Sequence, residues 1–139
     1  MNIGILGAGN IAGSMARTIC GMAAQGRPVT LCAVASRSQE KADAFAKAYG
    51  IPHAYGSYAA MLSDPFVELV YIATPHSHHA EQIRQCVAAG KPVLCEKSFT
   101  ANAKQAEEVL REAEAAGVYV AEAIWTRYMP ARGRIADII

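Results

Sequence analysis

The fold is decided near the start of the chain, by the stretch Ile3-Gly4-Ile5-Leu6-Gly7-Ala8-Gly9-Asn10-Ile11-Ala12-Gly13. A short apolar run ends in a glycine-spaced turn, and a helix-forming segment follows at once. Gly7 allows a sharp turn, Gly9 lets a ligand approach the backbone closely, and the small Ala12 lets the helix pack against the strand. This spacing is typical of the strand, turn and helix start of a βαβ unit that binds a dinucleotide.

The start of the helix, around Asn10, provides a site for phosphate. The first N–H groups of this helix have no partner inside it, and they lie at the positive end of the helix dipole. Glycine-rich turns that bind nothing occur in many loops, but this one follows a first strand and precedes a βαβ pattern. We therefore expect a dinucleotide's pyrophosphate to contact the following residues: Gly7, Ala8, Gly9, Asn10, Ile11 and Ala12.

The remainder of the chain alternates between strand and helix patterns. Predicted strands cover residues 2–6, 29–35, 51–55, 69–73, 92–95 and 118–123. Predicted helices cover residues 11–24, 39–49, 57–62, 75–90 and 102–116. This alternation predicts a Rossmann-type α/β fold, a doubly wound parallel sheet of about six strands with helices on both faces.

The chain contains one predicted domain and the start of a connection. Residues 1–123 form the expected dinucleotide-binding domain. Residues 124–139 are expected to begin the connection to a second, substrate-binding domain that this chain lacks, because the apolar pattern over residues 135–139 resembles a helix cut off without a cap.

Composition excludes several classes of function. The 139 residues are 53% hydrophobic and 18% charged, which is typical of a well-packed globular domain. A net charge of +1 gives no electrostatic reason to bind nucleic acid or an anionic membrane, and no apolar run is long enough to span a bilayer. We expect no targeting segment.

The four cysteines, Cys20, Cys32, Cys86 and Cys95, form no C-x-x-C pair, which disfavours a zinc site and indicates a reducing, cytoplasmic location.

Ser36-Arg37-Ser38 follows the second predicted strand, where a dinucleotide site recognises the adenosine ribose. An acidic residue there would accept from the 2′-hydroxyl of NAD, and none is present. Arg37 between two hydroxyls, with Lys41 one turn later, suits a 2′-phosphate. The sequence therefore favours NADP over NAD, although NAD is possible; the alternative is an arginine that is simply solvated.

The turn after the fourth predicted strand, Thr74-Pro75-His76-Ser77-His78-His79, is the most polar one. Three histidines invite a metal interpretation, but no carboxylate or cysteine converges with them in sequence, so we predict no metal site. The residues are either polar groups at a helix start or neighbours of a nicotinamide. The predicted cofactor contacts here are Ala73, Thr74, Pro75, His76 and His79.

Glu96 and Lys97 follow the fifth predicted strand directly. A lysine that lies beside a nicotinamide cation and is partly desolvated has its ammonium form disfavoured, which moves it toward use as an acid or base. Lys97 is the predicted catalytic residue; the alternative is a surface lysine paired with Glu96.

After the sixth strand, Trp125 and Arg127 are predicted cofactor contacts, although Trp125 is equally suited to core packing.

Together these motifs resemble the N-terminal domain of the glucose–fructose oxidoreductase / inositol dehydrogenase (Gfo/Idh/MocA) family. The resemblance rests on G-A-G-N-I-A at residues 7–12, A-T-P-H-S-H-H at 73–79 and C-E-K at 95–97. Residues 122–128 are similar to the dihydrodiol and sugar dehydrogenase branch. The resemblance implies NAD(P)-dependent hydride transfer at a hydroxyl carbon of a sugar, polyol or diol. It further implies that Lys97 orients cofactor and substrate and takes part in proton transfer, and that His79 lies near the nicotinamide.

Two departures from the family pattern bear on activity. Ser98 stands where the family has proline, which leaves the backbone beside Lys97 less restricted. Family members also continue into a second α/β domain, which supplies the substrate wall, the principal acid or base and most of an oligomer interface. We therefore expect this chain to bind cofactor without efficient turnover, and the full-length protein to be a homo-oligomer.

Two other interpretations of the chain's function remain open. One is a dinucleotide-binding module that senses or regulates without catalysis. The other is a domain fragment whose exposed face drives non-native association.

Overall fold

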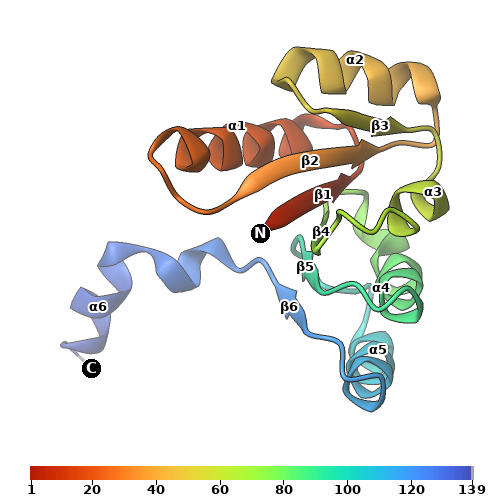
Figure 1. The fold of residues 1–139 in the computed structure, drawn as a ribbon. Coiled ribbons are helices and arrows are strands. Elements are labelled where there is room, and N and C mark those ends of the chain that lie inside the picture. Colours follow the sequence, from red (N-terminus) through yellow and green to blue (C-terminus); the bar gives the residue numbers. More distant parts are fainter. Residues whose placement is uncertain (139) are drawn as a thin grey trace.

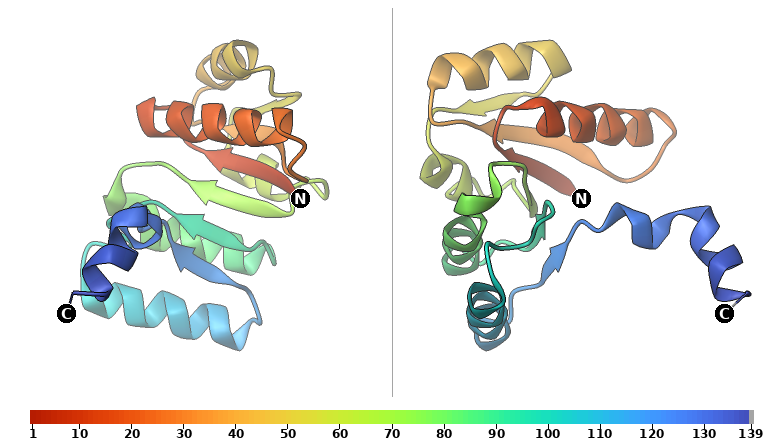
Figure 2. Two further views of the ribbon diagram at one scale, coloured as in Figure 1. Left: turned by 90° about the vertical axis from the view of Figure 1, so that its left-hand side faces the viewer. Right: turned by 180° about the vertical axis from the view of Figure 1, so that it is seen from behind.

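Six parallel strands form one sheet in the computed structural model, which describes residues 1–138. The strands are β1 (Asn2–Leu6), β2 (Thr30–Ala35), β3 (His53–Tyr55), β4 (Leu69–Ile72), β5 (Val93–Cys95) and β6 (Val120–Glu122). Their order across the sheet is β3-β2-β1-β4-β5-β6, and Figure 2 shows the arrows side by side and pointing the same way. This is the order of a dinucleotide-binding Rossmann sheet, so the predicted fold is confirmed.

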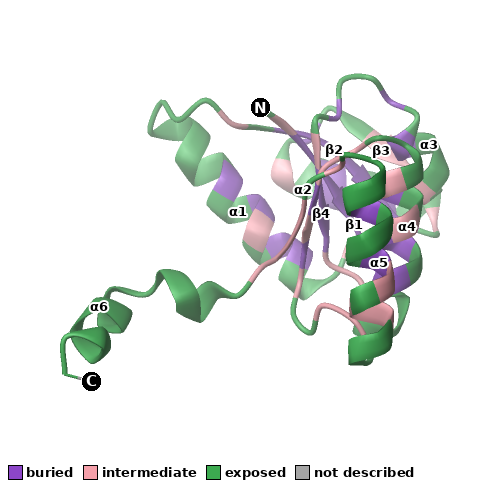
Figure 3. Ribbon diagram, turned by 90° about the horizontal axis from the view of Figure 1, so that it is seen from below, coloured by how far each residue is buried: buried purple, intermediate pink, exposed green. Residues whose placement is uncertain are grey.

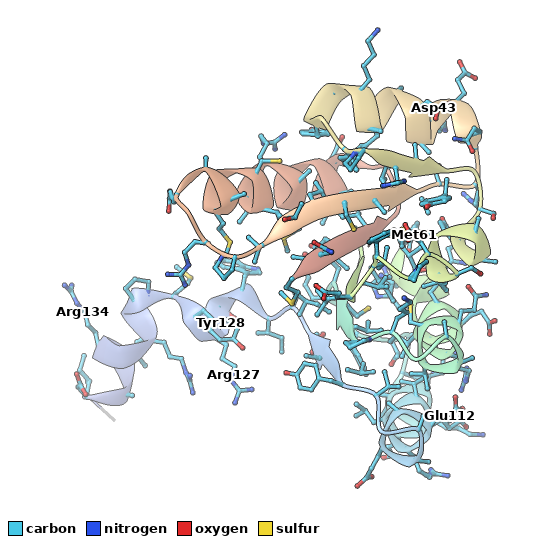
Figure 4. All side chains as sticks on the ribbon, viewed as in Figure 1. Asp43, Met61, Glu112, Arg127, Tyr128 and Arg134 are labelled. Carbon is cyan, nitrogen blue, oxygen red and sulfur yellow. The ribbon has the colours of Figure 1, made fainter. Side chains whose placement is uncertain are left out.

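Helices cover both faces of this sheet (Figure 1). On one face lie α1 (Asn10–Ala24) and α2 (Gln39–Tyr49); on the other lie α3 (Tyr58–Leu62), α4 (His79–Ala88) and α5 (Ala103–Ala115). Successive side chains of β4 point to opposite faces of the sheet. Tyr71 packs in the core beneath α1 and α2, whereas Val70 and Ile72 pack in the core on the other face. Met61 of α3, labelled in Figure 4, is fully buried in that second core.

The structure changes several predicted boundaries. The predicted helix over 75–90 divides into a 3₁₀ turn, η1 (His76–His78), and α4. A second 3₁₀ turn, η2 (Trp125–Tyr128), was not predicted. The predicted helix over 135–139 begins earlier, as α6 (Pro130–Ala136), because Pro130 occupies its first turn, where a missing N–H costs nothing. Residue 139 lies outside the described residues.

After β6 the chain leaves the sheet, and η2 and α6 extend away from it (Figure 1). Residues 124–138 are all exposed, whereas buried residues concentrate in the strands and on the helix sides that face them (Figure 3). The proposed boundary between residues 1–123 and 124–139 stays a prediction. Within the described residues, every helix is too short or too polar to cross a lipid bilayer.

Gly7 closes the turn between β1 and α1 in a conformation that other residues rarely adopt. Its φ is 104°, and a Cβ built on it would lie 3.0 Å from the carbonyl oxygen of Ala73. Its N–H donates to the carbonyl oxygen of Ala35 at 2.9 Å. The turn is therefore wedged between the ends of β2 and β4, and only glycine fits there without strain.

A second glycine was not singled out by the sequence. A Cβ on Gly13 of α1 would lie 2.5 Å from the hydroxyl oxygen of Tyr49, at the end of α2. That hydroxyl accepts from Arg17 at 3.1 Å. The missing side chain lets α1 and α2 approach each other on one face of the sheet.

The variant Gly7→Ala should lower the free energy of unfolding by about 1–3 kcal/mol, because it adds both a strained φ and a backbone contact. Gly26→Ala is the matched control: Gly26 also has a positive φ, 76°, but a Cβ there would meet nothing within 4 Å. Chemical denaturation of both variants checks this. Equal losses of stability would contradict the close-approach argument.

Candidate functional site

Five of the predicted site residues meet in a small pocket at the carboxyl ends of the strands. The pocket has a volume of about 60 Å³. Its walls come from the first turn of α1, the segment after β4 and the segment after β5, and consist of Ile11, Ala73, Thr74, Glu96 and Lys97. A dinucleotide is much larger than this pocket, so only one end of it would enter while the rest lies across the edge of the sheet.

A larger groove, of about 350 Å³, lies elsewhere, between α3 and α4. Its lining contains no charged side chain and consists of Ala59, Leu62, Ser63, Gln85, Ala88 and Ala89. Of the polar residues predicted from the sequence, Thr74, Glu96 and Lys97 line the smaller pocket, and none lines this groove.

The turn before α1 presents backbone amides to open space. Gly9 is the residue that caps α1, with φ −101° and no side-chain hydrogen bond to the helix. The N–H groups of the first helical turn have no acceptor within the helix. A Cβ built on Gly9 would meet nothing within 4 Å. This is the cradle that a pyrophosphate requires, and the residues present fit that group.

Two cations lie between the end of β2 and the first turn of α2. Arg37 and Lys41 are both exposed, and the ion pairs among residues 1–138 involve only the N-terminal amine and Arg84 as cations. Ser36 is buried, and the Ser38 hydroxyl caps α2 by accepting from the Lys41 N–H at 3.3 Å. The cap holds the two cations at the start of α2, on the side of β2 where a ribose would lie.

His79 lies beneath the pocket rather than in it. Its side chain is fully buried, with Nδ1 2.8 Å from the carbonyl oxygen of Ser98 and Nε2 2.9 Å from that of Thr74. The ring therefore links the segment after β5 to the segment after β4. The ring thereby supports the pocket walls, and its expected place near the nicotinamide stays a prediction. Pro75 and His76 are exposed at the rim and do not line the pocket.

The alternative interpretation of Lys97, a surface lysine whose ammonium pairs with the Glu96 carboxylate, differs from the contacts in the structure. One carboxylate oxygen of Glu96 accepts from the Tyr71 hydroxyl, and the other accepts from the backbone N–H of Lys97 at 3.2 Å. Within residues 1–138, no ion pair joins the Lys97 ammonium to a carboxylate. The exposed Lys97 side chain therefore lines the pocket without a charged partner. The Lys97–Ser98 peptide bond is cis.

Trp125 and Arg127 are not brought to the pocket. Both lie on η2, and Figure 4 shows Arg127 there, beyond the sheet. The Trp125 side chain is 62% exposed, so it does not pack in the core of the described residues. A role for these two residues in cofactor binding stays a prediction.

The histidines and cysteines do not gather. His76 and His78 are exposed while His79 is buried, and residues 1–138 contain no group of three His, Cys, Asp or Glu side chains that could hold a metal ion. Cys32, Cys86 and Cys95 are buried, and burial raises the pKa of the Cys86 thiol to about 12. Cys20 is exposed.

Known proteins resemble this chain in both sequence and fold. The profile of the oxidoreductase family with an NAD-binding Rossmann fold matches residues 1–124. Trans-1,2-dihydrobenzene-1,2-diol dehydrogenase of Mus musculus is 40% identical over 98% of this chain and 40% of its own length. The D-xylose 1-dehydrogenase (NADP(+)) of Hypocrea jecorina is 37% identical over 98% of this chain and 37% of its own.

Among solved structures, a 3-ketoreductase from Actinomadura kijaniata in complex with NADP superposes with a TM-score of 0.89 at 28% identity. The match covers 99% of this chain and 43% of the ketoreductase. The chain thus spans about two fifths of the length of these relatives. On its family profile and the sequence identity to its relatives, this chain belongs to the glucose–fructose oxidoreductase / inositol dehydrogenase family, as its NAD-binding Rossmann domain.

Proposed function

We propose that this chain is the cofactor domain of an NADP-dependent oxidoreductase that transfers a hydride between the nicotinamide and a hydroxyl carbon of a small sugar, polyol or diol. The observation that carries the proposal is the pocket itself, where an unpaired lysine, Lys97, meets the first turn of α1 at the carboxyl edge of the sheet. The dihydrobenzenediol and xylose dehydrogenases and the 3-ketoreductase among the relatives support the substrate class.

In this proposal the dinucleotide lies across the ends of β2, β1, β4 and β5. The pyrophosphate lies over Gly9 and the amides of α1, and the 2′-phosphate lies between Arg37 and Lys41. The nicotinamide end enters the pocket beside Thr74 and Lys97. When bound, the cofactor supplies the hydride acceptor or donor, while the residues of this chain orient it.

Lys97 is proposed to act on the substrate oxygen. Its ammonium has no carboxylate partner among the described residues, so its N–H groups are available to a ligand. With a cofactor bound in the pocket, Lys97 would be placed to exchange a proton with a substrate hydroxyl. The rest of the substrate site is proposed to come from a second domain, because the chain covers only 40% of a relative such as the mouse enzyme.

We also propose that the whole enzyme is a cytoplasmic homo-oligomer. Four unpaired thiols are compatible with a reducing compartment. Large apolar side chains at the end of the described chain, Trp125, Tyr128 and Ile135, are 62%, 83% and 56% exposed, which suits a surface that is covered by other protein.

Arg37→Asp should remove most of the preference for NADP⁺, since it replaces a phosphate-binding cation by an anion that accepts from a ribose hydroxyl. We expect the ratio of the NAD⁺ and NADP⁺ dissociation constants to fall by about tenfold or more. Calorimetric titration with each cofactor measures it. Arg27→Asp, at another exposed arginine, in the turn after α1, is the control and should leave the ratio unchanged. An unchanged ratio in Arg37→Asp would refute the phosphate site.

Lys97→Met should reduce kcat/KM of the intact oxidoreductase by about 10²- to 10⁴-fold, because the proton-transferring group is lost. Lys104→Met, an exposed lysine on α5, is the matched control. Steady-state rates with a panel of sugars, polyols and diols check both variants. A Lys97→Met enzyme with normal rates would contradict the catalytic assignment, and cofactor binding without any hydride transfer by the wild type would favour a sensor module.

A further inference from the structure

Two buried side chains outside the pocket each hold one of its polar walls. Tyr71 of β4 is 2% exposed, and Gln82 of α4 is 5% exposed. The Tyr71 hydroxyl donates to Oε1 of Glu96. The Thr74 hydroxyl donates to Oε1 of Gln82. Neither Tyr71 nor Gln82 lines the pocket, yet each one is bonded to a residue that does.

Thr74 is fixed at two of its atoms. Its hydroxyl proton is used by Gln82, and its carbonyl oxygen lies 2.9 Å from Nε2 of His79. His79 and Gln82 are three residues apart on α4, so the two contacts come from one side of that helix. A hydroxyl has a single proton, and once that proton is committed only the lone pairs of the oxygen remain. The hydroxyl oxygen of Thr74, a residue that lines the pocket, is therefore left with acceptor capacity only.

Glu96, like Thr74, is held by a buried side chain and keeps acceptor capacity. Its carboxylate receives one hydrogen bond from Tyr71 on Oε1 and one from the Lys97 N–H on Oε2, at 3.2 Å. An ionised carboxylate accepts about four hydrogen bonds, so lone pairs remain on both oxygens. Burial, followed by the hydrogen bond to Glu96, raises the pKa of Tyr71 well above its ordinary value, so its hydroxyl stays a donor.

We propose that Tyr71 and Gln82 are positioning residues that give the pocket its hydrogen-bonding polarity. Through them, Thr74 and Glu96 become acceptors beside the Lys97 ammonium, and the pocket takes a ligand end that carries hydrogen-bond donors. The donor groups of a nicotinamide nucleotide, its ribose hydroxyls and carboxamide N–H groups, have that chemistry. The inference rests on the proposed function and refines how the cofactor is oriented.

The same polarity rejects the opposite orientation. A phosphate placed in the pocket would face the Glu96 carboxylate and the lone pairs of Thr74, and like charges at close range repel. The cations Arg37 and Lys41 do not line the pocket, and they attract phosphate, as do the uncapped amides at the start of α1. The walls that Tyr71 and Gln82 hold would therefore direct the anionic part of a dinucleotide outward and its nicotinamide end inward.

The test separates the two ends of the cofactor. Tyr71→Phe and Gln82→Met each remove the bonding atom and keep a side chain of similar size. NADP⁺ and adenosine 2′,5′-bisphosphate, which lacks the nicotinamide half, are titrated calorimetrically into this chain and each variant. We expect the NADP⁺ dissociation constant to rise about three- to tenfold in each variant, the effect of one hydrogen bond. Binding of the bisphosphate should stay within about twofold of wild type.

Thr74→Val supplies a double-mutant cycle. If Gln82 acts through the Thr74 hydroxyl, Gln82→Met should cause no further loss of NADP⁺ affinity once that hydroxyl is absent. Thermal unfolding of each variant accompanies the titrations, and Tyr71→Phe provides an independent arm should Gln82→Met fail to fold.

Unchanged NADP⁺ affinity in both variants, or an equal loss for NADP⁺ and the bisphosphate, would overturn the inference and leave the proposed function standing. Additive losses in the cycle would overturn the route through Thr74. A wild-type chain that binds neither ligand would instead overturn the proposed function, and this inference with it.

Discussion

The close passage of Gly7 past the end of β4 is the constraint on which the site depends. A Cβ at Gly7 would lie 3.0 Å from the carbonyl oxygen of Ala73, so the chain turns within the width of a bare backbone. That turn starts α1 at Asn10, directly above the sheet edge, and directs its first amides toward open space. It also places Ile11 opposite Thr74 and Lys97, which completes the pocket.

The edge of the sheet is divided between two kinds of chemistry. Backbone N–H groups at α1 and the cations Arg37 and Lys41 offer positive charge near the ends of β1 and β2. Beyond β4 and β5, Thr74 and Glu96 offer lone pairs in a pocket that the Lys97 side chain also lines. This division matches a ligand that has phosphates at its centre and at one end. The other end of that ligand carries hydroxyl and amide donors.

Much of this arrangement could be predicted from the sequence, because it depends on local signals: apolar runs, glycine spacing and the position of polar residues at strand ends. The support beneath the pocket could not, because the bonds of Gln82 to Thr74 and of Tyr71 to Glu96 join residues 8 and 25 positions apart. His79 was predicted as a cofactor contact because it lies in a polar turn after a strand and because the family resemblance implies it. Its spacing from Ile83 and Cys86, four and seven residues on, already indicated the buried face of α4.

Amide hydrogen exchange of this chain with and without saturating NADP⁺ tests the central claim most directly, because it maps the bound cofactor without relying on turnover. The account predicts slower exchange over residues 7–13, 36–38, 73–76 and 96–98, which form the edge of the sheet from β2 to β5. Slower exchange confined to α3 and the end of α4, around the larger groove, would contradict it.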